Sequence, residues 1–242
     1  LFKEASMFMD KKNYKEAIPK LEKVIELMPD FVLAYKMLGD AKFDEGNFTE
    51  AVRWYTKAID GGVRDTRVFN DIGISLMHLE RYQEAIFYLE KAYQRQPYNP
   101  DILYSLASTL RDNKMLEKAL KMYKRLLILK YNYPNVHNDI AGIYELRGDI
   151  EAAEREYKNE IEVIAAQTSE IDEDVFTLQR LAVAYKGLGE YRKAQDIVDI
   201  ALEQYPYSGE LWYIRAQIYE KMGNIEEALK SCLLYTSPSP RD

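Results

Sequence analysis

The sequence is poor in the residues on which many kinds of active site are built. Its 242 residues include one cysteine, Cys232, and two histidines, His78 and His137. A single cysteine cannot form a disulfide within the chain, and zinc sites usually need three or four ligands at defined spacing. The sequence also lacks a phosphate-cradling glycine loop and a nucleophile motif. We therefore predict no catalytic residues, no metal site and no cofactor, and we interpret His137 as an aromatic residue at a helix contact.

Glycine, proline and positive charge are scarce as well. The chain has 11 glycines, 8 prolines and a formal net charge of -7, against 47% hydrophobic residues. This composition provides a core but little material for long loops, which is typical of helical proteins. The negative charge argues against nucleic-acid binding, which depends on Lys and Arg at the phosphates. The twenty tyrosines could stack on bases, but those at 35, 55, 123, 144, 157, 185 and 219 fall on core positions of the repeat described below, and no basic stripe accompanies the tyrosines.

Long hydrophobic runs are absent too. No stretch approaches the roughly 20 apolar residues that cross a bilayer, so we predict no membrane-spanning segment. The chain begins with Leu1 rather than Met, and its repeat opens partway through a helix, so we expect the natural N-terminus to lie upstream. A secretion signal or lipid anchor would lie there. Localisation is therefore left open, with the cytoplasm as the working expectation.

What the sequence does contain is a repeat. Small residues recur in pairs at a spacing of 34 residues, with one interval that is longer by seven. Large apolar residues at helical spacing lie between them, so each unit is predicted to be two helices. Glycines at 46, 148, 189 and 223 fit the turn between these helices. The first small residues are Ala5, Gly39, Gly73, Ala107, Ala141, Ala182 and Ala216; the second are Ala17, Ala51, Ala85, Ala119, Ala153, Ala194 and Ala228.

This pattern resembles the tetratricopeptide repeat family, whose motif has an aromatic residue, Leu-Gly, an aromatic, Ala, an aromatic, Ala and Pro in that order. In the second unit these positions fall on Tyr35, Leu38, Gly39, Ala51, Tyr55 and Ala58. The resemblance covers residues 1–231. It implies an all-α fold, a right-handed α-solenoid of about seven helix-turn-helix repeats of which the first and last are incomplete. Departures from the motif are Lys42, Glu160 and Arg215, and Glu80 and Lys114 stand at turn positions where glycine is usual.

The register divides residues 1–231 into a single array. The predicted repeats span approximately 1–31, 32–65, 66–99, 100–133, 134–167, 175–208 and 209–231, with an insertion at 168–174. That insertion is predicted to lengthen two helices and their loop, or to form a protruding acidic contact site.

The last eleven residues, 232–242, read CLLYTSPSPRD. They break the helical pattern, since position 235 should be small and is Tyr235. The string resembles the conceptual translation of a transposase adapter used in sequencing libraries, so we predict a non-native tail; the alternative is a Ser/Pro-rich disordered tail.

In the tetratricopeptide family the first helix of each repeat lines a concave groove that holds the partner. The resemblance implies thirteen principal contact positions here, and Glu145 belongs to the same set. The first five units are acidic on balance in this groove and the sixth is basic, so we predict a polar or basic peptide or protein partner; the alternative is a solvated face with no fixed ligand. The thirteen positions are Lys36, Asp40, Arg67, Asn70, Asp71, Asp101, Tyr104, Ser108, Arg111, Asn138, Asp139, Arg180 and Lys186.

Chaperone-binding members of the family hold a C-terminal carboxylate in a basic clamp. Lys36 matches the first clamp position, but Asp40, Asp71, Asp101 and Ser105 occupy the others. These residues replace attraction with repulsion, so we do not expect a chaperone tail to bind.

Taken together, the repeat and its groove predict a non-enzymatic scaffold or adaptor that binds other proteins. Two alternatives remain open from the sequence. The array could be the substrate-recognition arm of a larger enzyme such as a glycosyltransferase, or a lipid-anchored assembly factor of a bacterial envelope.

The repeat register makes a direct prediction about stability. Ala85→Leu should overpack the crossing between two helices and lower the free energy of unfolding by about 1 to 3 kcal/mol. Thermal denaturation followed by circular dichroism measures this change. A midpoint equal to that of the parent would count against the register.

Overall fold

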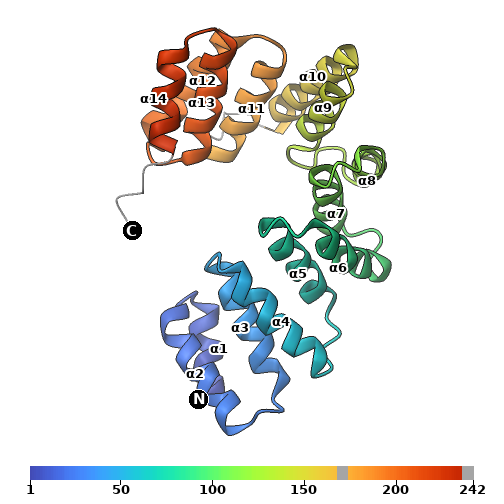
Figure 1. The fold of residues 1–242 in the computed structure, drawn as a ribbon, viewed down its shortest axis with the longest axis vertical. Helices are drawn as coiled ribbons and strands as arrows, with labels where there is room; N and C mark the ends of the chain where they lie inside the picture. Colours follow the sequence, from blue (N-terminus) through green and yellow to red (C-terminus); the bar gives the residue numbers. More distant parts are fainter. Residues whose placement is uncertain (168–173, 236–242) are drawn as a thin grey trace. The chain divides into compact units, whose positions relative to one another are not determined.

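A computed structural model describes residues 1–167 and 174–235, and every regular element in these ranges is an α-helix. The all-α fold predicted from the repeat is therefore confirmed. The helices follow one another along the chain as hairpins (Figure 1). The predicted insertion at 168–174 lies outside the described residues apart from Asp174, as does 236–242 of the predicted tail.

The chain divides into two compact units, Leu1–Tyr131 and Asn132–Asp242. In unit 1 the helix pairs are α1 (Phe2–Asp10) with α2 (Tyr14–Leu27), α3 (Val32–Asp44) with α4 (Phe48–Asp60), α5 (Thr66–His78) with α6 (Tyr82–Arg95), and α7 (Pro100–Asp112) with α8 (Leu116–Leu129). In unit 2 they are α9 (Val136–Leu146) with α10 (Ile150–Gln167), α11 (Val175–Gly187) with α12 (Tyr191–Gln204), and α13 (Gly209–Lys221) with α14 (Ile225–Tyr235).

Small residues allow the two helices of each pair to pack closely. Gly39 of α3 lies against Tyr55 of α4, and a Cβ at Gly39 would lie 2.4 Å from the Tyr55 ring. Gly73 of α5 meets Leu89 of α6 in the same way, also at 2.4 Å. Since real Cβ contacts are longer than this, only glycine fits at these two crossings. The large side chains opposite are themselves buried and form part of the core.

Packing between consecutive pairs is uneven within each unit. The first helices of neighbouring pairs contact one another, as α3 does α5 and α5 does α7 in unit 1, and as α9 does α11 and α11 does α13 in unit 2. Among the helices described, no two second helices bring their backbones close together, and long side chains span the distance, as where Arg125 Nη1 of α8 donates to Tyr93 Oη of α6 at 2.6 Å. Each unit is therefore narrower on the side of its first helices. We call the surface formed by these first helices the inner face and the opposite side the outer face.

The end of α14 corrects one sequence prediction. Residues up to Tyr235 continue the helix instead of breaking it. The large side chain fits because Gly209 faces it: a Cβ at Gly209 would lie 3.3 Å from the Tyr235 ring, and the ring of Tyr213 lies 5.7 Å away between centroids. The pattern argument failed because it considered one repeat position without the residue opposite it.

The turns between paired helices depend on one residue with a positive φ. Gly46, Gly148 and Gly189 take this conformation at φ values of 73° to 76°. Glu80 and Lys114 adopt it as well, at 58° and 62°, although they carry a side chain. The turn geometry is thus kept where glycine is missing, at a cost in backbone strain.

This strain can be relieved by substitution. Glu80→Gly and Lys114→Gly should each raise the free energy of unfolding by roughly 0.5 to 1 kcal/mol, because glycine adopts the left-handed region without a steric penalty. Chemical denaturation of each variant measures the gain. Glu16→Gly, inside α2, is the matched control and should lower stability; a loss of stability in the turn variants as well would contradict the account.

Candidate partner-binding site

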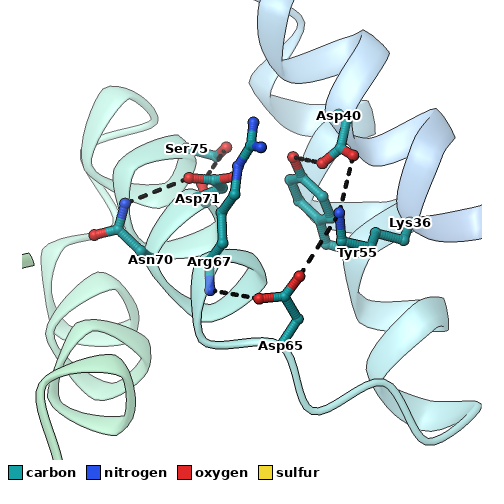
Figure 2. A network of polar contacts seen from close by, with 8 residues as sticks. All are labelled: Lys36, Asp40, Tyr55, Asp65, Arg67, Asn70, Asp71 and Ser75. Atoms are coloured by element: carbon teal, nitrogen blue, oxygen red, sulfur yellow. Dashed lines mark hydrogen bonds and ion pairs between the residues drawn. The ribbon is translucent and has the colours of Figure 1, made fainter. Parts of the chain in front are cut away.

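The inner face of unit 1 carries a network of charged and polar side chains from two neighbouring first helices. Lys36 and Asp40 lie on α3, and Arg67, Asn70 and Asp71 lie on α5. Figure 2 shows Asp40 and Asp71 directed toward the space between these helices. Five of the residues predicted from the repeat register are therefore brought together in one place.

Asp40 is held from two directions. Tyr55 Oη donates a hydrogen bond to Asp40 Oδ1 at 2.9 Å, and Lys36 Nζ lies 3.2 Å from Asp40 Oδ2. The same Lys36 Nζ lies 3.7 Å from Asp65 Oδ2, while Asp65 Oδ1 accepts a hydrogen bond from the backbone of Arg67 and caps α5 (Figure 2). Burial, followed by the Asp40 charge, raises the pKa of Tyr55, so its hydroxyl remains protonated and available as a donor. These contacts orient the Asp40 carboxylate before any partner arrives.

Asp71 is the more buried carboxylate of the network. Its side chain is 9% exposed, and it accepts from Arg67 Nε and from Asn70 Nδ2, both at 3.3 Å. Burial raises the pKa of Asp71, and Asp40 raises it further, whereas Arg67 and Asn70 oppose the shift. Within the described part of the chain, Asn70 Oδ1 is buried without a hydrogen-bond partner. The site thus contains a carboxylate, Asp71, whose burial is only partly offset by its contacts with Arg67 and Asn70. Next to it lies a side-chain oxygen, Asn70 Oδ1, that accepts no hydrogen bond from the described part of the chain.

The predicted residues on α7 fall into two groups. Asp101 is exposed, whereas Ser108 is buried and hydrogen-bonded to Tyr123 Oη at 3.1 Å. Tyr104 packs edge-on against Tyr123 with 6.0 Å between centroids, and the Arg111 guanidinium lies 2.9 Å from Asp112. Ser108 therefore lies beneath the inner face, where it supports the surface instead of forming it.

In unit 2 the predicted residues Asn138, Asp139 and Arg180 belong to a buried polar network. Arg180 Nε lies 2.7 Å from Glu160 Oε1, and Glu160 is fully buried. Asn138 Nδ2 donates to the backbone oxygen of Arg180 at 3.0 Å, which ties α9 to α11. Arg180 is only 4% exposed, so its charge is directed to Glu160 and not to the surface. Removing one partner of such a pair is strongly destabilising, because the other charge stays buried.

Lys186 lies at a cavity of about 430 Å³ in unit 2. Its ammonium donates to Gln217 Oε1, and Glu145 and Lys221 also line the cavity. Burial lowers the pKa of Lys186, and the nearby Lys221 lowers it further, while Glu145 opposes both effects. The cavity therefore holds a partly desolvated cation on the inner side of α9, α11 and α13.

Several residues of these sites were not predicted. Tyr55 was assigned only to the core, yet its hydroxyl reaches Asp40. Glu160 was noted as a departure from the motif, but not as the partner of Arg180. Glu220 lies one 34-residue period after Lys186 and also lines the unit 2 cavity, so the register could have identified it.

The two histidines lie in different packed environments. His137 is buried and its Nδ1 lies 2.6 Å from Glu156. His78 stacks on Phe48 with 4.2 Å between ring centroids, and burial lowers its pKa. In residues 1–167 and 174–235, no group of three or more His, Cys, Asp and Glu side chains is placed to hold a metal ion. No helix in the same ranges combines the length and the apolar character required to cross a membrane.

Comparison with known proteins decides the family. Tetratricopeptide repeat models match residues 76–138 in one case and residues 2–65 and 180–242 in another. The matches cover more than half of the sequence. The chain belongs to the tetratricopeptide repeat family. Membership supports a general role as a protein-interaction scaffold, since such proteins bind protein or peptide partners.

Similar proteins include other tetratricopeptide proteins of varied length. The TPR repeat-containing protein MJ1428 of Methanocaldococcus jannaschii is 27% identical over 174 residues, which are 67% of this chain and 29% of that protein. The chain spans 29% to 52% of the length of the three curated relatives that it matches.

Solved structures show the same fold. YrrB, described as a TPR protein with an unusual peptide-binding site, is 19% identical with a TM-score of 0.63, over 67% of this chain and 84% of that one. The APC/C hetero-tetramer Cut9-Hcn1 contains a chain that is 14% identical with a TM-score of 0.70, over 98% of this chain and 46% of that one. At these identities the likeness concerns the fold, and it confirms the tetratricopeptide solenoid.

The raised pKa of Asp71 in this tetratricopeptide groove predicts a pH dependence. A carboxyl whose folded-state pKa exceeds its unfolded value costs stability when ionised, and this cost disappears as the pH falls below about 3.8. The neutral Asp71→Asn variant lacks that cost. Its free energy of unfolding, relative to wild type, should therefore increase as the pH rises from 3.8 through the raised pKa and stay constant above it.

Denaturant unfolding at a series of pH values measures this difference, in which contributions from acidic residues that do not interact with Asp71 cancel. Asp30→Asn, which changes an exposed carboxylate, is the control. A relative stability of Asp71→Asn that decreases with rising pH would show that its contacts with Arg67 and Asn70 outweigh its burial.

Proposed function

We propose that the chain is a non-enzymatic scaffold that binds a partner peptide along the inner face, and that the partner presents lysine, arginine or amide side chains to α3 and α5. The observation that carries this proposal is the arrangement of Asp40, Asp71 and Asn70. Two carboxylates on neighbouring helices face the same space there, and one of them, Asp71, is buried with a raised pKa beside Asn70 Oδ1, an acceptor that lacks a donor. Cationic and amide donors would satisfy all three groups.

The cations already present leave capacity for a ligand. Lys36 and Arg67 neutralise part of the charge of Asp40, Asp65 and Asp71. Three carboxylates against two cations leave the network with a formal charge of -1. The Arg67 side chain is 66% exposed, so it can turn away from Asp71 when a partner cation enters. Binding of a donor-rich segment would thus replace an intramolecular contact with an intermolecular one.

Unit 2 would add a second contact region. Its cavity is lined by Lys186 and Lys221 and by Glu145 and Glu220, so it offers both donors and acceptors and would take a polar side chain such as an amide. The peptide-binding site described for YrrB supports ligand binding by a related fold. The two units then favour a partner with basic and polar residues in the segment that contacts unit 1.

The alternatives of an enzyme's substrate-recognition arm and a lipid-anchored assembly factor are compatible with the same inner face. They differ from a free-standing scaffold in the domain or signal sequence that would precede or follow the repeats in the full-length protein. The complete reading frame around this sequence distinguishes them: a catalytic domain or an anchor signal would favour one of these alternatives.

Selection from a random library of 12-residue peptides tests the charge preference. The wild-type chain should enrich Lys, Arg, Asn and Gln. The double variant Asp40→Asn/Asp71→Asn should bind the enriched peptides at least about tenfold more weakly, because charge-assisted hydrogen bonds are lost.

The matched control is Asp30→Asn/Asp60→Asn, which removes the same charge from exposed positions off the inner face. This variant should keep the affinity of wild type. Equal weakening in both double variants would mean that the attraction depends on net charge alone, and selection of acidic peptides would overturn the proposal.

A further inference from the structure

The outer side of unit 1 contains a basic cavity that the inner-face account does not use. It has a volume of about 420 Å³ and is lined by Ile59, Arg64, Phe69, Lys91, Gln94 and Arg95. Ile59 lies on α4, Phe69 on α5, and the last three residues on α6, with Arg64 in the loop before α5. The backbones of the second helices α4 and α6 do not approach one another closely, and the cavity lies between these helices.

Phe69 forms an apolar floor over which two cations are stacked. The Arg95 guanidinium carbon lies 4.2 Å from the centre of the Phe69 ring, and Lys91 Nζ lies 5.9 Å from it. Lys91 Nζ also lies 4.1 Å from the ring centre of Phe87, which is 53% exposed. These cation–π contacts hold both charges over the aromatic surface without neutralising them.

The two arginines are positioned by backbone oxygens. Arg95 Nη1 donates to the Arg64 carbonyl at 3.0 Å. Arg64 Nη1 donates in turn to the carbonyls of Ile59 and Val63, at 2.8 Å and 2.9 Å. Each guanidinium still has other N–H donors available, and the fixed fork geometry suits an oxyanion.

None of the three cations makes an ion pair with a carboxylate in residues 1–167 and 174–235. Arg64, Lys91 and Arg95 thus concentrate positive charge in a chain whose net charge is -7. Other surface cations of unit 1 are paired with carboxylates, for example Arg53 with Glu50 and Arg81 with Glu84. Such a concentration of unpaired charge around a cavity is what an anionic ligand requires.

We propose that this cavity is a binding site for a phosphoryl group. A phosphate monoester carries roughly -1.5 to -2 charges at pH 7 and offers three acceptor oxygens, which matches three converging cations better than the single charge of a carboxylate does. The group could belong to a phosphorylated side chain of a protein partner or to a free phosphate ester. The site is independent of the inner face, so it would stand if the charge preference of Asp40 and Asp71 were disproved.

The test is an NMR titration of the full chain that follows the arginine Nε–Hε signals. The probes are inorganic phosphate, O-phosphoserine and the peptide acetyl-Gly-Ala-pSer-Ala-Gly-amide, with the same peptide carrying Glu in place of phosphoserine for comparison. We expect the signals of Arg64 and Arg95 to shift with the phosphorylated probes. Tighter binding of the phosphopeptide than of phosphoserine would identify a protein segment as the source, and equal binding would identify a free phosphate ester.

Variants assign the binding to the cavity. Arg64→Gln and Arg95→Gln should each weaken binding roughly tenfold, since each removes charge-assisted hydrogen bonds. Lys91→Gln should also weaken binding, and it leaves Arg95 stacked on Phe69. This variant therefore tests the cavity even if the Arg95→Gln variant does not fold. Arg53→Gln, on the same unit but outside the cavity, should not change the affinity.

Three results would overturn the proposal. The arginine signals could fail to respond to any phosphorylated probe. The Glu peptide could bind as tightly as the phosphopeptide, which would indicate a general anion site. The Arg53→Gln variant could weaken binding as much as Arg64→Gln does, which would indicate non-specific attraction.

Discussion

The close contact of the two helices within each pair is the constraint on which the other features depend. Where a glycine or alanine stands at the crossing, the partner helix approaches until a large side chain such as Tyr55 or Leu89 fills the space. The pair then acts as a compact block, and within each unit the blocks stack with the backbones of their first helices in contact and those of their second helices farther apart. This uneven stacking creates both surfaces of interest, the inner face and the gap between α4 and α6.

The same contact links the core to the polar chemistry of unit 1. Tyr55 is buried because Gly39 leaves room for its ring, and its hydroxyl emerges beside Asp40. Packing of α5 against α3 then places Asp71 within the electrostatic influence of Asp40. Burial and the Asp40 charge both raise the pKa of Asp71. A repeat built for packing therefore also determines where charged groups meet, and it concentrates acidic groups on one face and basic groups in a separate cavity.

Much of this arrangement could be predicted from the sequence, because periodicity specifies the neighbours of each residue along a helix and across a pair. The all-α repeat follows from the spacing of small residues, and the register placed Lys36, Asp40 and Asp71 on first helices, where the structure has them. What periodicity does not supply is contact between side chains of different repeats. The burial of Arg180 against Glu160, for example, depends on how far one pair rotates relative to the next.

The most direct test of the account is hydrogen–deuterium exchange on the full chain with and without a peptide selected for binding. If the inner face is the binding surface, exchange should slow in α3 and α5 when the peptide is added, and it should stay unchanged in α4 and α6. Slower exchange confined to α4 and α6 would contradict the account, because it would place the partner on the outer face.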